Sequence, residues 1–149
     1  MVGSDVQRGR GLKALSTAIY TLATGSTFMS YIGNRLFKGR APTGIAYPYC
    51  VYFVVTDNPE RGFSERYEHI EVQFSIFSDD LNSSTQVETA YNHLAALYDE
   101  CDLTITGYDL VWFRTLDTVG AQVEDWITPN GTQEVWAIHA TFEVLISLK

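Results

Sequence analysis

The side chains that most often carry chemistry are spread thinly along this sequence. Cys50 and Cys101 lie far apart in apolar surroundings, without a Cys-x-x-Cys spacing. We therefore expect reduced thiols in the core of a protein from a reducing compartment, not a disulfide. His69, His93 and His139 fall on three different predicted elements, so no pair has the short spacing of metal ligands. The sequence predicts no metal site.

Catalytic motifs are equally absent from the printed sequence. No serine stands in a Gly-x-Ser-x-Gly context, and neither cysteine has a motif that pairs it with a histidine. Gly3, Gly9 and Gly11 precede every predicted strand, whereas a phosphate-binding loop follows a strand and opens a helix. The acidic pairs lie at predicted element ends or in loops, where solvated carboxylates are usual: Asp79–Asp80, Asp99–Glu100 and Glu124–Asp125. We predict no catalytic residue and no cofactor.

The features that remain point to binding. Arg61 and Arg66 flank Phe63, a combination that can stack on a nucleobase or anchor a protein partner. The chain has 10 Lys and Arg against 18 Asp and Glu, a net charge of -8, which repels phosphate backbones and anionic membranes. A protein partner is therefore favoured. Tyr47, Tyr49 and Tyr52 are interpreted as packing residues of a strand.

Length and composition indicate a folded chain. Its 149 residues favour one domain, and 46% hydrophobic with 19% charged residues is ordinary for a globular protein. The longest nearly apolar run, Ala46 to Val55, is too short to cross a bilayer, and residues Met1 to Gly11 lack the apolar core of a signal peptide. We expect a flexible arm over 1–11, one domain over 12–149, and a protein that stays in the cytoplasm of the cell that makes it.

The first part of the chain predicts one helix and two strands. Apolar residues at helical spacing indicate a helix that ends before Gly25: Leu12, Leu15, Ile19 and Leu22. Phe28 to Gly44 is broken by glycines and predicts a short strand or an irregular crossing, anchored by Leu36 and Phe37. Tyr49 to Thr56 predicts a buried strand, and Asp57 to Glu65 a polar loop.

The second part predicts an alternating strand, a helix and a long final strand. The alternating strand places Ile70, Val72, Phe74 and Ile76 on the core face and His69, Glu71, Gln73 and Ser75 on the other. Ser83 and Gln86 form a candidate capping box for a helix that runs to about Glu100, with a stripe of Val87, Ala90, Tyr91, Leu94, Leu97 and Tyr98. A bent strand or hairpin is expected around Gly107, and Glu134 to Ser147 is long enough to pair with two neighbours.

Together these elements predict an α+β two-layer domain. The sheet is expected to be mainly antiparallel, or mixed, with about four to five strands and two helices on one face. Thr115 to Gly131 is interpreted as a projecting loop or an extended hairpin. This segment and the predicted loop Asp57 to Glu65 are longer than a small domain needs, and such segments often become ordered against partners.

The order of these landmarks resembles the tail terminator, or tail completion, proteins of long-tailed bacteriophages and related prophages. The resemblance covers about Leu12 to Ser147, and the segments that carry it are the opening helix, Ile32 to Phe37, Tyr47 to Tyr52, Glu68 to Ser78, the helix through Tyr91, Leu94 and Leu97, and Ala140 to Val144. It implies a structural virion protein without catalysis, located in the tail neck and assembled in the host cytoplasm. Such proteins form a ring, commonly hexameric, that ends polymerisation of the tail tube. The ring also provides the surface for head–tail joining.

The implied partners are further copies of the chain, the major tail tube protein and the head connector or completion proteins, while DNA passes through the lumen without specific binding. Charge divides unevenly: Met1 to Arg66 has eight Lys and Arg against four Asp and Glu, and Tyr67 to Lys149 has two against fourteen. Because a ring needs two different patches to meet, opposite charges suit its interfaces. The candidate interface residues are Arg35, Lys38, Arg40, Arg61, Phe63, Arg66, Glu124, Asp125 and Trp126. A head-side connector completion protein, or a small ligand-binding domain or enzyme, remains the alternative.

Overall fold

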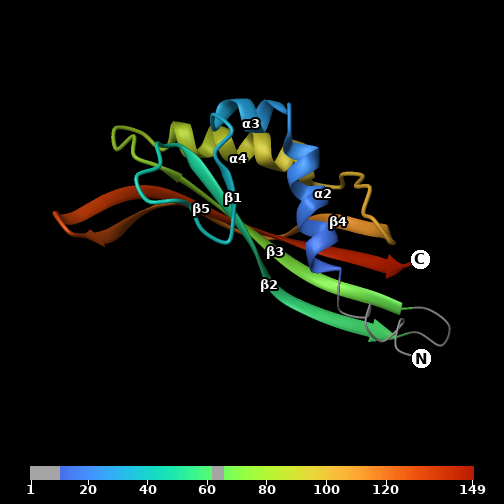
Figure 1. Ribbon diagram of the computed structural model, residues 1–149. Helices are drawn as coiled ribbons and strands as arrows, with labels where there is room; N and C mark the ends of the chain where they lie inside the picture. Colours follow the sequence, from blue (N-terminus) through green and yellow to red (C-terminus); the bar gives the residue numbers. More distant parts are fainter. Residues whose placement is uncertain (1–10, 62–65) are drawn as a thin grey trace.

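A mixed sheet of five strands, with helices on one face, forms the architecture of the computed structural model (Figure 1). The structure describes residues 11–61 and 66–149. The elements are α2 (Leu12–Ala23), α3 (Thr27–Tyr31), β1 (Leu36–Lys38), β2 (Tyr49–Arg61), β3 (Arg66–Ser78), α4 (Thr85–Tyr98), β4 (Tyr108–Thr128) and β5 (Gly131–Leu148). The strand order is β1-β2-β3-β5-β4; β1 runs parallel to β2, and the other pairs are antiparallel. The predicted α+β two-layer class is confirmed.

The first helix lies where its apolar stripe predicts. Leu15 and Ile19 are buried against the sheet, and the chain leaves α2 at Gly25, whose φ of +79° favours glycine. The short helix α3 that follows is a correction, since Phe28 to Gly44 predicts no helix. Its first turn is stabilised because the backbone N–H of Met29 donates to Ser26 Oγ at 3.1 Å. The expected short strand is β1, which includes Leu36 and Phe37.

The predicted polar loop Asp57 to Glu65 is wrong for the part that the structure describes. Residues 57–61 continue β2, with registers running from Asp57↔Ile70 to Arg61↔Arg66. Residues 62–65 lie outside the described residues. The polar composition of this segment favoured a loop in the sequence. The segment is nevertheless a strand, because pairing with β3 supplies backbone hydrogen bonds that do not depend on the side chains. The alternation on β3 is confirmed, since Ile70, Val72, Phe74 and Ile76 are all buried.

Helix α4 has the predicted stripe but different ends. It stops at Tyr98, and Asp99 is its C-cap, so the expected end at Glu100 is two residues too late. The capping box is wrong as well. Ser83 Oγ accepts from the N–H of Thr85, and the side chain of Gln86 accepts from Ser78 Oγ, so the reciprocal bonds of a capping box are not made.

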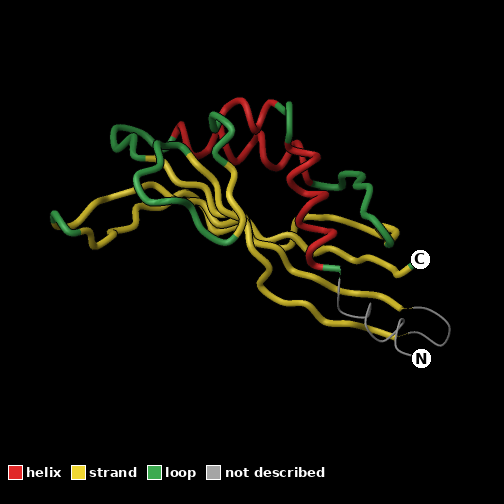
Figure 2. The backbone as a smooth tube through the Cα atoms, in the orientation of Figure 1, coloured by secondary structure: helices red, strands yellow, loops and turns green. Residues whose placement is uncertain are grey.

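Strands β4 and β5 form one long hairpin, which confirms the extended-hairpin alternative for Thr115 to Gly131 and contradicts the loop. The strands have 21 and 18 residues and pair from Tyr108↔Leu148 to Thr128↔Gly131. Three register shifts on β4 accommodate its irregular pattern. Figure 2 shows this hairpin extending past the helices at one end of the sheet and β2–β3 extending at the other. As predicted, β5 pairs with two neighbours, β3 and β4. The residues before Gly107 contribute only an isolated bridge, Ile105↔Tyr108.

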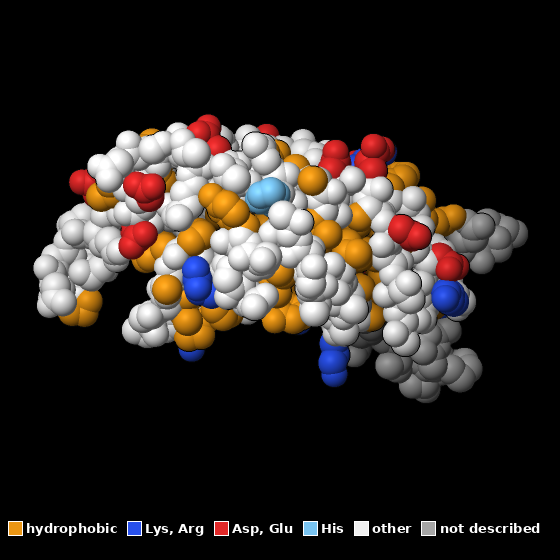
Figure 3. Space-filling view, turned by 90° about the horizontal axis from the view of Figure 1, so that it is seen from above, with side chains coloured by type: hydrophobic (Ala, Val, Ile, Leu, Met, Phe, Trp, Pro, Cys, Tyr) orange, Lys and Arg blue, Asp and Glu red, His pale blue; other side chains and the backbone are white. Residues whose placement is uncertain are grey.

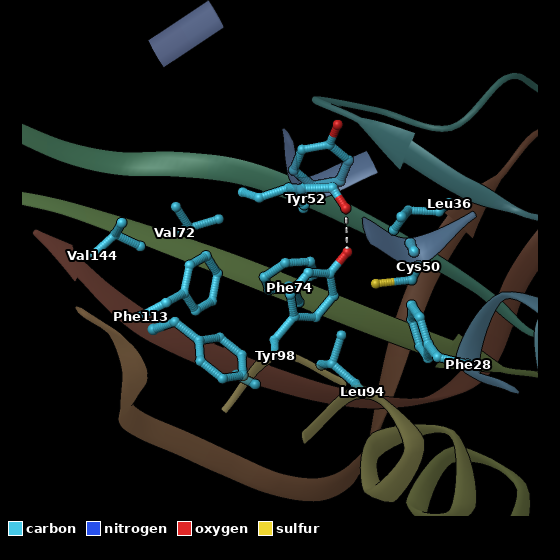
Figure 4. Close-up of a cluster of buried hydrophobic side chains, with 14 of the residues drawn as sticks. Phe28, Leu36, Cys50, Tyr52, Val72, Phe74, Leu94, Tyr98, Phe113 and Val144 are labelled. Carbon is cyan, nitrogen blue, oxygen red and sulfur yellow. Dashed lines mark hydrogen bonds between the residues drawn. The ribbon is translucent and has the colours of Figure 1, made fainter. Parts of the chain in front are cut away.

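The main core lies between the helices and the sheet, and aromatic rings occupy its centre (Figure 4). Phe74 has no exposed surface and lies 4.8 Å from the Tyr98 ring and 5.5 Å from the Phe142 ring, centroid to centroid. The Tyr98 hydroxyl donates to the carbonyl of Ile19 at 2.7 Å, which ties α4 to α2. The buried hydroxyl of Tyr98 therefore has a specific partner.

Candidate functional site

The second face of the sheet, opposite the helices, holds some of the predicted interface residues that the structure describes, among them Trp126 and Glu124. A small cluster of buried residues lies there: Tyr49, Val51, Phe77, Val135 and Ala137. Cys50 and Tyr52 alternate with these residues and point into the main core instead, so β2 is apolar on both faces. Tyr49 and Tyr52 therefore pack as predicted, on opposite faces.

Arg35 is used inside the fold. Its Nε donates to the carbonyl of Pro48 at 3.0 Å and its Nη2 to the carbonyl of Tyr47 at 3.1 Å. The guanidinium thus connects the end of the α3–β1 turn to the segment that enters β2, where the Tyr47–Pro48 peptide bond is cis. A guanidinium fork suits two neighbouring carbonyls, so Arg35 holds this segment in place within the chain. Its role at an interface stays a prediction.

Lys38 and Arg40 are exposed at the β1 edge of the sheet. Arg40 belongs to the segment after β1 that forms one wall of a groove of about 650 Å³. The floor and far wall of this groove include Tyr49, Phe77 and Trp126. The structure therefore brings one predicted cation, Arg40, and one predicted aromatic residue, Trp126, to the same groove, although 86 positions separate them in the sequence.

Trp126 and Glu124 are fixed by neighbours, whereas Asp125 is exposed. The Trp126 ring lies 4.9 Å from the Phe77 ring in an edge-to-face arrangement, and its Nε1 donates to Glu124 Oε1 at 3.3 Å. Arg66 begins β3 and is half-buried. Phe63 lies outside the described residues, and of Arg61 only the backbone, at the end of β2, is described. The expectation that Arg61, Phe63 and Arg66 form one binding element stays a prediction.

A line of polar contacts crosses three strands on this face, and nothing in the sequence pattern pointed to it. Ser75 Oγ lies 2.7 Å from His139 Nδ1, and His139 Nε2 lies 2.6 Å from Glu124 Oε2. The register Ser75↔His139 on β3–β5 places these two residues directly opposite each other, and Glu124, whose partner on β5 is Val135, reaches His139 with its side chain. Only the strand register reveals this proximity, because 64 positions separate Ser75 from His139.

The same three residue types perform acyl transfer in serine hydrolases, but this geometry does not support that chemistry. Ser75 is only 4% exposed. It sits on a strand paired on both sides, with Val51 and with His139, so the neighbouring N–H groups take part in the sheet and cannot stabilise an oxyanion. The line of contacts therefore serves as a cross-strand hydrogen-bond network.

A second network lies further along this face. Arg114 Nε donates to Glu143, and His69 Nε2 lies 3.3 Å from the other carboxylate oxygen of Glu143. The Arg114 guanidinium also lies 4.0 Å above the Trp112 ring. The hydrogen bond from Arg114, joined by that from His69, outweighs the effect of burial and lowers the pKa of Glu143 below its usual value.

The pKa values of Glu124 and of the two cysteines are also shifted, by hydrogen bonds in the first case and by burial in the second. Desolvation acts to raise the pKa of Glu124, but hydrogen bonds from His139 and Trp126 reverse this and lower it overall. Burial raises the pKa of the Cys50 thiol and raises that of Cys101 to about 12. Both cysteines are free, Cys50 buried and Cys101 half-buried. Because the thiolate is the nucleophile, neither group is activated for chemistry.

Residues 11–61 and 66–149 contain no group of three or more His, Cys, Asp or Glu side chains placed to hold a metal ion. No helix in that same part of the chain has the length and apolar character needed to span a membrane.

Comparison with known proteins supplies a fold relationship. No protein-family model matches the chain, and no curated protein matches it in sequence. A chain of a virion shares this fold. The match is to a structure described as the virion of a native gene transfer agent particle, with a TM-score of 0.70 over 92% of this chain and 97% of that one, at 13% identity. A second solved chain gives a TM-score of 0.53 over 89% of this chain and 94% of that one, also at 13% identity.

Both matches extend over nearly the whole of each chain, so the likeness concerns the fold as a whole. At 13% sequence identity, these matches establish a shared fold and not a shared function. The surface residues described above belong to this chain, and their roles have to be argued from their own chemistry.

Proposed function

We propose that this chain is a structural component of a phage-like virion and that it acts as the tail terminator. The observation that carries the proposal is the fold shared with a gene transfer agent virion chain over 92% of this chain. The order of elements in the sequence resembles tail terminators and is independent support, because it does not depend on the three-dimensional structure. The geometry of the Ser75 network supports a structural rather than a catalytic role.

In this role, copies of the chain form a closed ring at the head-proximal end of the tail tube, as do the tail terminators that the sequence resembles, whose rings are commonly hexameric. The ring ends polymerisation of the major tail tube protein and offers its other side to the head connector or completion proteins. DNA passes through the lumen without specific binding, which suits a net charge of -8 because like charges do not hold a polyanion. The protein belongs to the neck of the virion and joins it in the host cytoplasm.

The experiment is assembly of tails with and without this protein, followed by length measurement in the electron microscope. We expect tubes that exceed the normal length when the protein is missing, and normal length when purified chain is added back. Tubes of normal length in its absence would contradict the proposal. If such tubes also fail to join heads, the protein belongs to the head side of the neck instead.

A further inference from the structure

The β1 edge of the sheet carries positive charge. Lys38 on β1 and Arg40 just beyond it are both exposed, and neither forms an ion pair with any residue that the structure describes. Since β1 covers only Cys50 to Tyr52, the following residues of β2 are uncovered at the same edge. Phe53 is 37% exposed and Val55 46% exposed, so an apolar strip accompanies the two cations.

The opposite edge, β4, carries negative charge. Asp117 and Asp125 are exposed on the strand, and Glu100 and Asp102 are exposed in the segment that leads to it. The two cations near this edge are engaged by carboxylates of the same chain: Arg114 with Glu143, and Lys149 with Asp109 at 3.9 Å. The helix-side view agrees, with Asp and Glu mostly toward one long margin and Lys and Arg mostly toward the other (Figure 3).

The β4 edge also has an apolar strip. Leu116, Val119 and Val123 are each between 44% and 47% exposed, and they lie along the same part of the strand as Asp117 and Asp125. Exposed aliphatic residues in a row, bordered by charge, are typical of a surface that contacts another protein. Each edge therefore combines an apolar strip with exposed charges of one sign that have no ion-pair partner among the described residues.

The backbone of β4 argues for side-chain contact rather than an added strand. Glu100 N–H donates to the carbonyl of Phe113 at 2.8 Å, and the N–H of Thr115 donates to Asp99 Oδ1 at 2.9 Å. These bonds occupy outer groups at Phe113 and Thr115, and the register shifts between Thr115 and Asp117 and between Val119 and Gln122 interrupt the regular ladder in the part that follows. A partner on this edge meets side chains first.

We propose that the β4 edge of one copy docks against the β1–β2 edge of a second copy, with Asp117 and Asp125 facing Lys38 and Arg40. This interface rests on the proposed function, because it is the contact that would build the ring. It joins two different patches, so repeated contacts form a closed ring when the rotation closes and a filament when it does not. Closure covers both open edges of every sheet, which otherwise invite uncontrolled association.

The test is a charge exchange, read as the mass distribution of the purified full chain over a concentration series. We expect Lys38→Glu with Arg40→Glu to weaken self-association by about tenfold or more, and Asp117→Lys with Asp125→Lys to do the same. All four changes in one chain should restore association to within a few-fold of the wild type. The matched control joins Lys38→Glu and Arg40→Glu to Asp79→Lys and Glu88→Lys, which restores the same net charge away from the β4 edge.

Each outcome decides the interface. Restoration by the β4 changes and not by the control supports it. Equal restoration by the β4 changes and by the control overturns the interface, because net charge alone would then explain the result. The interface is also overturned if the charge reversals leave self-association unaffected, or if the wild-type chain stays monomeric at every concentration. The proposed function fails separately: tails of normal length without the protein would refute the terminator role while leaving the exchange result intact.

Discussion

Replacing Arg35 should destabilise the fold, although the side chain looks like a surface cation in the sequence. Its guanidinium donates to the carbonyls of Pro48 and Tyr47 at 3.0 and 3.1 Å, and the residue is half-buried. A hydrogen bond from a charged donor contributes roughly 1.5–3 kcal/mol, and water replaces part of it at a half-buried position. For two such bonds we expect Arg35→Ala to lower the free energy of unfolding by about 2–3 kcal/mol.

The matched controls are Lys38→Ala and Arg40→Ala, two exposed cations a few positions away. Neither makes an ion pair with a described residue, so each should change the free energy of unfolding by less than about 0.5 kcal/mol. In a chain of this length about 2–3 kcal/mol corresponds to a lowering of Tm by roughly 5–10 °C. Arg35→Lys should lie between, because an ammonium group lacks the fork that reaches both carbonyls.

The assay is urea unfolding followed by circular dichroism, at a protein concentration low enough that self-association adds nothing to stability. A substitution at Gly33 tests the same contact of Arg35 independently. A Cβ at Gly33 would lie 2.6 Å from Arg35 Nη1, and its φ is +61°, so Gly33→Ala strains the backbone and displaces the guanidinium. In the Arg35→Ala background, Gly33→Ala adds only the backbone strain. The losses in free energy of unfolding of the two single variants should therefore sum to more than the loss of the double variant. Full additivity, or a loss for Arg35→Ala no larger than for Lys38→Ala, would refute the bracing role.

Two other predictions concern the core and the polar face. Tyr98→Phe should lower the free energy of unfolding by about 1–2 kcal/mol, because the buried hydroxyl donates to the carbonyl of Ile19 at 2.7 Å. Tyr91→Phe, which loses a contact to Thr118 Oγ1 at a half-buried site, should cost less than about 0.5 kcal/mol in the same measurement, and equal losses would contradict the interpretation. The pKa of Glu143 is lower in the folded chain than its usual 4.5, so the stability it contributes is present above that pH and is lost as the pH falls through the folded value. Unfolding measured across this acid range should therefore depend less on pH in Glu143→Gln, and an unchanged dependence would count against the Arg114 contact.

The sequence predicted the elements whose own side chains determine them. The stripe of α2, the alternation of β3 and the length of β5 are periodic patterns that only one packing arrangement satisfies. The fold class followed from their order. What the sequence did not show is the order of strands in space, since β5 is inserted between β3 and β4 and makes two antiparallel pairings.

The loop predicted for Asp57 to Glu65 and the loop alternative for Thr115 to Gly131 failed for one physical reason. Both segments contain many polar residues and turn formers, so local preference favours a loop. Residues 57–61 and 115–128 are strands because their partner strands supply backbone hydrogen bonds, an effect of tertiary pairing that local preference does not contain. The network around His139 was missed for the same reason, because it depends on register across three strands.

Strand order also decides what the uneven charge of the sequence means in space. The basic part of the chain ends at Arg66, which is the first residue of β3, so β1 and β2 belong to that part and β3, β5 and β4 to the acidic one. In the order β1-β2-β3-β5-β4 this boundary falls between the neighbouring strands β2 and β3, so Lys38 and Arg40 lie at one edge of the sheet and Asp117 and Asp125 at the other. Had β4 and β5 been added beside β1, cations and carboxylates would have neutralised one another within a single molecule. The observed order leaves them for contact with another molecule, and this makes a head-to-tail contact between copies electrostatically more favourable than contact between two identical edges.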